Sequence, residues 1–341
     1  MKFVFRTILV KLTLLILVIV SLNVIYSYTF FNIDLQDYSP MGSQIIEHKG
    51  SDIYYFGESS NATFAFNDST KESISELISH NFPNFKLASI DTGAVHAGAY
   101  KYWLNMIDLK HKPKLIIVTM NLRSFGAGWI NSKLETSIQK STVLMRKYPN
   151  ILNRFALSLG FFDNKSEKER FDDMINSWKK IELNSMRNLK HKTVLEWDSV
   201  MGNGGWLLEN GNWDIKKMEL GCHYIKAYAF NINESNLRLK DFDEILEWGK
   251  INGVKIIFSI MPENIEYADS CVGEALVDIM RQNRDFLVKR YTLTGAFVVD
   301  NLELVEGRNY IDQNWTSEHY NQVGRIAVAK HISNVMRDQM Y

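Results

Sequence analysis

Five short apolar runs, separated by longer segments with helical periodicity, constrain the fold of this chain more than any other feature. The runs are rich in β-branched and aromatic residues, as buried parallel strands are. They span Asp52 to Phe56, Lys86 to Ile90, Lys114 to Thr119, Val254 to Ile260 and Ala296 to Val299. Helices are expected over Lys71 to Ser79, Ala97 to Leu109, Leu239 to Asn252, Glu274 to Tyr291 and Asn321 to Met340. This alternation predicts an α/β fold, in which an open parallel sheet is covered on both faces.

The alternation is interrupted between about residues 124 and 236. Pro149 to Gly160 and the charged segment Lys165 to Lys192 have helical character, whereas Met201 to Trp213 is rich in Gly and Asn and predicts an irregular loop. Because the strand pattern resumes afterwards, we interpret this segment as a largely helical insertion into one domain.

The run from Leu12 to Phe31 is long and apolar enough to cross a hydrocarbon layer of ~30 Å as a helix. A cleaved signal peptide is the alternative, but the run is longer than its usual apolar region, and no small-x-small cleavage pattern follows. Basic residues precede the run, which places the amino terminus in the cytoplasm; they are Lys2, Arg6 and Lys11. We therefore expect a cytoplasmic segment over 1–11, a single transmembrane anchor over 12–31, a linker over 32–50 and an extracytoplasmic domain, periplasmic or extracellular, over 51–341.

Charge and cysteine content exclude several functions. Lys+Arg and Asp+Glu are 39 each, so the chain has no net positive charge for binding nucleic acid. Cys222 and Cys271 are too few and too far apart for a zinc ribbon, an iron–sulfur site or a disulfide scaffold, and the sequence leaves open whether they pair. The histidine spacings of metal sites and the Gly-rich loops of nucleotide sites are missing, so we expect neither a metal nor another cofactor.

Polar residues follow several of the predicted strands, at the edge where ligands bind in open α/β sheets. The most distinctive are Ser59 after the first strand, Gly93 after the second, Asn121 after the third, and His319 shortly before the last helix. Each has a structural interpretation on its own: a helix cap for Ser59, a turn for Gly93, a strand-end cap for Asn121 and a surface position for His319. Their expected meeting at one edge favours a chemical role.

Acyl transfer requires a hydroxyl nucleophile, a base that takes its proton, and N–H donors aimed at the developing oxyanion. Ser59, on a tight strand-to-helix turn, would present its Oγ and its own backbone N–H. Gly93 lets a second backbone N–H approach because it has no side chain, and the Asn121 carboxamide can donate a third hydrogen bond. Histidine changes charge near neutrality, so His319 suits the role of base and then acid.

At these residues the sequence resembles the SGNH/GDSL hydrolase superfamily, whose serine esterases and acyl-transfer enzymes are named for Ser, Gly, Asn and His in four ordered blocks. Gly57-Glu58-Ser59 resembles the Gly-Asp-Ser block with Glu for Asp, and His319 with Asn321 and Gly324 resembles the last block. The resemblance covers about residues 51–332 and leaves 124–236 unmatched. It implies a three-layer, flavodoxin-like sheet of five strands, Ser59 as nucleophile, His319 as base, and the N–H groups of Ser59 and Gly93 with Asn121 as the oxyanion hole.

Two positions depart from the family pattern. Thr316 replaces the acid that usually stands three residues before the histidine, so Asp312, Glu318 or a backbone carbonyl would orient the imidazole. A family-like loop points Glu318 elsewhere, and we therefore favour Asp312. Thr119 replaces the glycine that usually lies two residues before Asn121.

Other side chains are weaker candidates for substrate contacts. His96 lies near the proposed oxyanion hole, but a solvent-facing helix start fits it better, and Arg123 suits an anionic substrate but fits an exposed structural ion pair better. Trp206 and Trp213 suit sugar stacking and, equally, packing of the insertion.

The sequence therefore predicts a membrane-anchored, outward-facing serine esterase or O-acyltransferase that works through an acyl-serine. Anchoring among envelope polymers points to an acyl ester, such as an acetyl ester, of a cell-envelope polysaccharide or other glycan as the substrate and partner. The alternative, favoured by Thr316, is a non-catalytic glycan-binding or assembly protein with the same fold. Hydrolysis and transfer share the acyl-enzyme, and the sequence does not separate them.

Overall fold

The computed structural model describes residues 2–185, 189–204, 208, 211–212 and 214–340. In this part of the chain, five strands form one parallel sheet in the order β2-β1-β3-β4-β5. They are β1 (Ile53–Gly57), β2 (Leu87–Asp91), β3 (Leu115–Met120), β4 (Lys255–Ile260) and β5 (Phe297–Asp300), each beginning one residue after its predicted start. This is the strand order of flavodoxin-like sheets, and the predicted fold class is confirmed.

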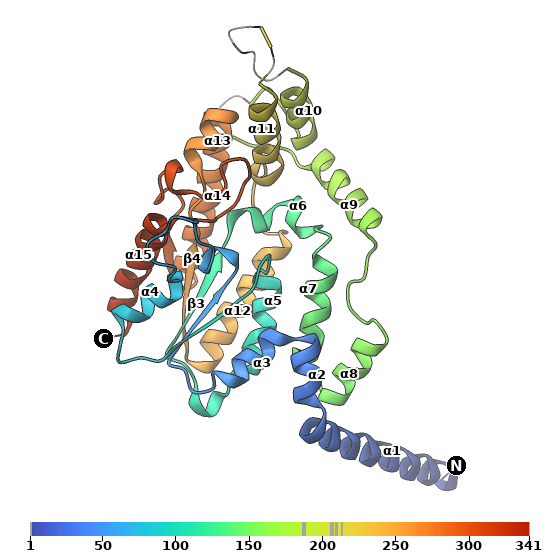
Figure 1. Cartoon of the computed structure of the whole chain (residues 1–341). Coiled ribbons are helices and arrows are strands. Elements are labelled where there is room, and N and C mark those ends of the chain that lie inside the picture. The colour runs from blue at the N-terminus through green and yellow to red at the C-terminus, as the bar shows by residue number, and fades with distance from the viewer. Residues whose placement is uncertain (1, 186–188, 205–207, 209–210, 213, 341) are drawn as a thin grey trace.

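Each face of the sheet has its own apolar core, because successive strand residues point to opposite faces. Tyr54 and Phe56 belong to the core on one face, with α5 (Ala97–Trp103), α12 (Leu237–Asn252) and α14 (Glu274–Leu293). Ile53 and Tyr55 belong to the core on the other face, with α4 (Ile74–Asn81) and α15 (Gln322–Met340). Figure 1 shows α4 and α15 on one side of the sheet and α5 and α12 on the other. The strands are therefore buried on both sides, which explains their continuous apolar sequences.

Local signals fix where the helices begin and end. Ser73 and Glu76 form a capping box, so α4 begins at Ile74, after the predicted start. The helix expected over residues 97–109 is interrupted, since α5 ends at Trp103 and two 3-10 turns follow, η2 (Leu104–Met106) and η3 (Leu109–His111). The α12 helix ends at Gly253, whose φ of +62° suits a residue without a side chain.

The segment between β3 and β4 is mostly helical, as predicted. It contains η4 (Leu122–Phe125), α6 (Ala127–Ile130), α7 (Glu135–Thr142), η5 (Val143–Met145), α8 (Asn150–Ser158), α9 (Glu167–Lys180), α10 (Val194–Gly204) and α11 (Ile215–Tyr228). The helix expected over 165–192 ends at Lys180, and Glu182 then pairs with Thr193 in an isolated antiparallel bridge. The loop expected from Met201 is wrong at its start, because α10 continues to Gly204. Trp206 and Trp213 lie outside the described residues.

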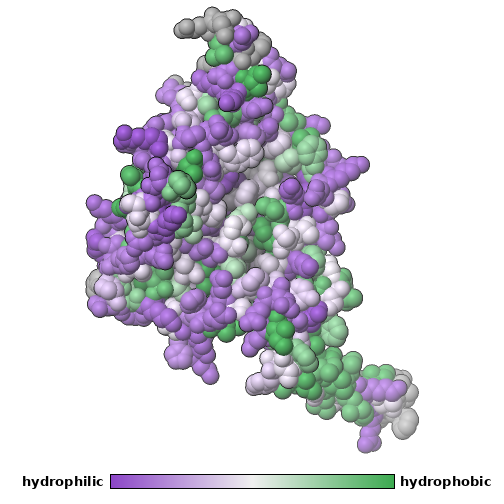
Figure 2. All heavy atoms as spheres, in the orientation of Figure 1, coloured by the Kyte–Doolittle hydropathy of each residue, from purple (hydrophilic) through white to green (hydrophobic). Residues whose placement is uncertain are grey.

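The amino-terminal helix α1 (Lys2–Thr29) projects from the body of the molecule (Figure 1). Within Phe5–Thr29, the most apolar window of 18 residues has a mean hydropathy of 2.7, and the helix is long and apolar enough to cross a membrane. In Figure 2 the projecting helix is green along most of its length and purple near its end. Two short helices follow, α2 (Phe31–Tyr38) and α3 (Pro40–Glu47), and bury Leu35 and Ile45 in the core. The segment expected as a linker is therefore packed against the domain.

Contacts with the insertion fix α1 to the domain. The backbone N–H of Ile151, in α8, donates to the side-chain oxygen of Asn23 at 3.0 Å, and Asn150 donates to Ser27 at 3.1 Å. Arg154 of the same helix pairs with Asp34 of α2 at 2.6 Å. The junction between α1 and the domain is therefore held by polar contacts on α8.

Candidate active site

Ser59 opens a 3-10 turn, η1 (Ser59–Asn61), that follows β1 after one residue. Its Oγ lies 2.9 Å from Nε2 of His319, a residue 260 positions further along the chain. Asn61 holds the turn in place, since its amide donates to Asp91 at 2.7 Å and its oxygen accepts from the backbone N–H of Ser75 at 2.9 Å. The nucleophile predicted from the sequence is thus next to the predicted base, on a turn fixed by neighbouring elements.

The second ring nitrogen of His319 faces a carboxylate. Asp312 Oδ2 lies 2.7 Å from His319 Nδ1 and also accepts a hydrogen bond from Ser317 Oγ at 2.6 Å. The loop folds back on itself, with the backbone N–H of Ile311 donating to the carbonyl of His319 at 2.9 Å, so Asp312 lies beside the histidine. With Nδ1–H donating to Asp312, Nε2 is left to accept the proton of Ser59, which is the tautomer that a base requires.

The pKa of Asp312 lies below its ordinary value. Burial acts to raise this pKa, but the hydrogen bonds from Ser317 and His319, together with the charges of His319 and Arg123, outweigh it. Asp312 is therefore ionised at neutral pH and can stabilise the positive imidazole that forms when His319 takes a proton.

Glu318, the other acid considered, points away from the imidazole. Its carboxylate pairs with Arg123 at 2.5 Å, and Arg123 also donates to the carbonyl oxygen of Thr316. The side chains of Arg123 and Glu318 are only 15% and 2% exposed. The expectation of an ion pair at Arg123 is confirmed, but its expected exposure is wrong, because successive residues of the loop point in opposite directions and Glu318 points inward.

A second carboxyl group adjoins this buried ion pair. Glu263 is buried and accepts a hydrogen bond from Tyr228 at 2.5 Å. Burial, followed by the negative charge of Glu318, raises the pKa of Glu263 well above its ordinary value. The surroundings thus favour the protonated form of Glu263 beside the Arg123–Glu318 ion pair.

Glu58 and Thr119, which both differ from the pattern of the superfamily that the sequence resembles, contact each other. Glu58, which stands for Asp, accepts hydrogen bonds from Ser60 at 2.5 Å and from the Thr119 hydroxyl at 3.0 Å. Burial raises the pKa of Glu58 to about 7, helped by the charge of Glu318 and opposed by the hydrogen bond from Ser60. Thr119 stands where a glycine is usual. Its hydroxyl donates a hydrogen bond to the carboxyl group of Glu58, whose side chain is longer than that of Asp.

The Ser59–His319 pair opens into a cavity of about 220 Å³, whose lining includes Asn121, Ala94, Trp129 and Trp315. The Asn121 side chain makes no hydrogen bond to another described residue, and its oxygen is buried without a partner. Its carboxamide is therefore uncommitted within the structure. Neither tryptophan was singled out by the sequence, because only the folded insertion and loop bring them to this cavity.

Gly93 lines an adjacent cavity of about 190 Å³ and is not among the residues of the larger one. A Cβ at Gly93 would meet no atom within 4 Å, so close packing does not require glycine there. The neighbouring residue, Ala94, has a φ of +62°, a conformation uncommon for residues with a side chain. The strained backbone at this edge thus lies at Ala94, one residue after the predicted glycine.

His96 was expected to face solvent, but it is buried, with only 3% of its surface exposed. Its Nε2 lies 2.8 Å from Glu135, and its Nδ1 accepts from the Gly98 backbone N–H at 3.1 Å and lies 2.7 Å from Arg238. Burial and the charge of Arg238 lower the pKa of His96. The expected exposure is wrong because the insertion and α12 cover the start of α5, where His96 serves as the cap.

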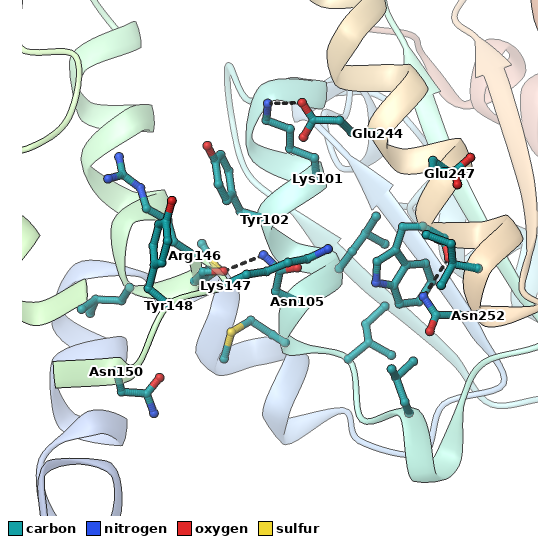
Figure 3. Close-up of a pocket in the computed structure, with 18 of the residues that line it drawn as sticks. Lys101, Tyr102, Asn105, Arg146, Lys147, Tyr148, Asn150, Glu244, Glu247 and Asn252 are labelled. Carbon is teal, nitrogen blue, oxygen red and sulfur yellow. Dashed lines mark hydrogen bonds and ion pairs between the residues drawn. The ribbon is translucent and has the colours of Figure 1, made fainter. Parts of the chain in front are cut away.

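A larger cavity of about 1100 Å³ lies elsewhere, between η2, α12 and the start of α8. Figure 3 shows Lys101 paired with Glu244 on one side of it and Arg146, Lys147 and Tyr148 on another. The described residues that line it include no serine, cysteine or histidine. It therefore lacks a nucleophile and base for acyl transfer.

Metal and thiol chemistry find no support in the described residues. No group of three or more His, Cys, Asp or Glu side chains there could hold a metal ion. Cys222 and Cys271 are not disulfide-bonded to each other, and burial raises the pKa of both thiols.

No protein family profile matches the chain, and no curated protein matches it. Among solved structures, a Bacteroides fragilis protein described as an acylhydrolase is 11% identical, with a TM-score of 0.37 and coverage of 90% of this chain and 97% of that one. A variant of an acetyl-xylooligosaccharide esterase from Geobacillus is 10% identical, with a TM-score of 0.38 and coverage of 84% and 94%. An α/β hydrolase from the metagenome of Lake Arreo, Spain, is 11% identical, with a TM-score of 0.38 and coverage of 85% and 96%. Likeness at this level does not establish an activity.

Proposed function

We propose that this chain is a membrane-anchored serine esterase or O-acyltransferase of the SGNH type, which forms an acyl-serine at Ser59. The observation that carries the proposal is the hydrogen-bonded series from Ser59 Oγ to His319 Nε2, 2.9 Å, and from His319 Nδ1 to Asp312, 2.7 Å. An ordinary helix-capping serine has no need of a histidine oriented by an ionised carboxylate.

In the proposed reaction, His319 Nε2 takes the proton of Ser59 as the Oγ attacks the ester carbonyl carbon. The oxyanion accepts hydrogen bonds from the Ser59 backbone N–H and from the otherwise unbonded Asn121 carboxamide, both of which line the cavity; the backbone N–H of Gly93, which lines the adjacent cavity, is the third proposed donor. Collapse breaks the bond to the alcohol oxygen, which leaves with the proton from His319. Water or a sugar hydroxyl then gives its proton to His319 and attacks the acyl-serine, which restores Ser59.

The proposed substrate is a short acyl ester, an acetyl ester in the simplest case, on a cell-envelope glycan. The cavity at Ser59 is small, about 220 Å³, which favours a short acyl group. An α1 helix of membrane-spanning length supports an anchored position, in which the domain lies outside the cytoplasm among envelope polymers.

Labelling with a fluorophosphonate probe tests the nucleophile. We expect the detergent-solubilised chain to take the probe covalently and Ser59→Ala to take none. Ser124→Ala is the matched control, since Ser124 lines the same cavity but donates its hydroxyl to the Asn121 carbonyl; this variant should keep the label.

Hydrolysis of p-nitrophenyl acetate gives the second readout, and Ser59→Ala should abolish it. Label that persists in Ser59→Ala would exclude Ser59 as the nucleophile. A folded chain that takes no probe and hydrolyses no ester would support the alternative of a non-catalytic glycan-binding or assembly protein.

A further inference from the structure

An aromatic cleft of about 390 Å³ adjoins the cavity at Ser59 and shares Arg123, Trp129 and Trp315 with it. Its walls come from α6, α9 and α11 of the insertion and from the loop that carries His319. Phe171 and Trp315 are 56% and 53% exposed there. Two large aromatic side chains left half-exposed in one cleft are typical of a binding surface rather than of a packed core.

The aromatic rings of the cleft are held in place by their neighbours. The guanidinium of Arg123 lies 5.0 Å from the centre of the Trp129 ring, and Arg123 is itself fixed by Glu318. The rings of His223 and Trp315 are 4.0 Å apart between centroids. Gly128 leaves room for Trp178, since a Cβ there would lie 3.3 Å from the Trp178 ring. These contacts preform the side of the cleft made by Trp129, Trp178 and Trp315, which lowers the entropic cost of binding there.

The position of the cleft indicates which part of an ester it would receive. In acyl transfer the histidine protonates the departing alcohol oxygen, so the alcohol part lies on the imidazole side of the serine. Trp315 and Thr316 line the cleft and belong to the same loop as Asp312 and His319. The cleft thus adjoins the alcohol part of the substrate.

The lining combines aromatic faces with a few polar groups. A pyranose ring presents C–H groups on its faces, which pack on aromatic rings, and hydroxyl groups at its edge, which need hydrogen-bond partners. His223, Lys226 and Arg123 supply polar atoms beside the rings of Phe171 and Trp315. An aliphatic chain would have no use for these polar groups, and so the lining favours a sugar.

We propose that this cleft is a carbohydrate subsite, in which Trp315 and Phe171 pack against a pyranose ring of the acylated glycan while its ester oxygen faces His319. The inference rests on the proposed function for the orientation of the ester, but binding of the sugar itself does not require turnover. The proposed surface differs from Trp206 and Trp213, for which the sequence left sugar stacking and packing of the insertion open.

The test compares two kinds of ester on the detergent-solubilised full chain. The probes are O-acetylated trisaccharides of xylose, glucose and N-acetylglucosamine, with p-nitrophenyl acetate and p-nitrophenyl octanoate as sugar-free esters. For at least one trisaccharide, Trp315→Ala and Phe171→Ala should each lower the ratio of its kcat/KM to that of p-nitrophenyl acetate at least tenfold. Phe161→Ala is the matched control, because Phe161 is an exposed aromatic residue of the insertion outside the cleft; it should change the ratio less than twofold.

Binding to Ser59→Ala separates failure of the cleft from failure of the enzyme proposal. An acetylated trisaccharide should quench the tryptophan fluorescence of Ser59→Ala, and the added Trp315→Ala change should weaken that binding at least tenfold. If the unaltered chain hydrolyses p-nitrophenyl acetate but neither binds nor deacetylates any of the three trisaccharides, the subsite is overturned and the enzyme stands. If Trp315→Ala loses activity on p-nitrophenyl octanoate alone, the carbohydrate subsite is overturned in favour of a site for the acyl chain. If it loses activity equally on all esters, the subsite is also overturned, and Trp315 only supports the loop that carries His319. Trisaccharide binding without turnover or probe labelling would retain the subsite and reject the enzyme.

Discussion

Asp312 contacts the imidazole of His319 from seven positions earlier in the chain, with 2.7 Å between its Oδ2 and the ring Nδ1. The loop makes this possible because Tyr310 and Tyr320 pair in an antiparallel bridge, so residues on its two arms lie side by side. The position three residues before the histidine holds Thr316, whose carbonyl accepts from Arg123 instead. An acid for the histidine is therefore available although the usual position lacks one.

Asp312→Asn should lower kcat on p-nitrophenyl acetate by ~10³- to 10⁴-fold, because an amide favours the wrong histidine tautomer, as in the serine proteases. Steady-state kinetics on the solubilised chain measures this. Asp269→Asn, an exposed position on α13 (Ile265–Cys271), serves as the control and should leave kcat unchanged. A fall of less than tenfold in Asp312→Asn would mean that a dyad suffices.

Glu58→Gln should remove a pH dependence of stability. The pKa of Glu58 is about 7 in the folded chain and near 4.5 when unfolded, so the folded state keeps a proton that the unfolded state releases. The contribution of Glu58 to the free energy of unfolding should therefore be fully present below pH 4.5. It should fall by up to about 3 kcal/mol as the pH rises through 7. Urea unfolding of the solubilised chain at pH 4.5, 5.5, 7 and 8 should show a smaller decline in Glu58→Gln. Parallel curves for the two proteins would contradict a protonated Glu58.

Replacing Glu263 or Glu318, the two carboxyl groups beside Arg123, with Gln should change the free energy of unfolding by different amounts. Burial favours the protonated form of Glu263, and Gln keeps an acceptor for Tyr228, so Glu263→Gln should alter the free energy of unfolding by less than about 1 kcal/mol. Glu318→Gln leaves the buried charge of Arg123 without its partner and should cost about 3 kcal/mol. Urea unfolding at pH 7 compares the pair directly. Equal losses would contradict the expected difference, and a larger loss in Glu263→Gln would place the negative charge on Glu263 instead.

The carboxyl terminus should lie outside the cytoplasm. A phosphatase that is active only after export, fused after Tyr341, should be active on the full chain and inactive when residues 2–29 are deleted. Membrane fractionation should recover the uncleaved fusion with the membranes. Recovery as a shortened soluble protein would indicate a cleaved signal peptide instead, and an inactive fusion would reverse the proposed orientation.

The strands could be predicted because each is a continuous apolar run, and burial on both faces of a parallel sheet requires such a run. The break in the helix after Trp103 could not, since the sequence there keeps its helical periodicity while η2 and η3 replace the regular helix. The meeting of Ser59 with His319 followed from the rule that strand ends share one edge.

The surroundings of the site depend on contacts between distant segments, which local patterns do not reveal. His96 is buried because Glu135 and Arg238, far along the chain, close over it. Trp315 and Trp129 reach the cavity from a loop and from the insertion. Their position in the sequence is the only signal that could have indicated them: Trp315 lies four residues before His319, and Trp129 lies six residues after Arg123.

The attachment of α1 has a consequence for the reach of the domain. Asn23 and Ser27 of that helix are hydrogen-bonded to α8. One residue separates α1 from α2 and one separates α2 from α3, and both short helices pack into the core. If α1 spans the bilayer as we propose, these contacts hold Ser59 at a set height above it. Under the proposed function, only ester groups that come to that height would be modified, so the fold itself would limit which part of a glycan chain the enzyme reaches.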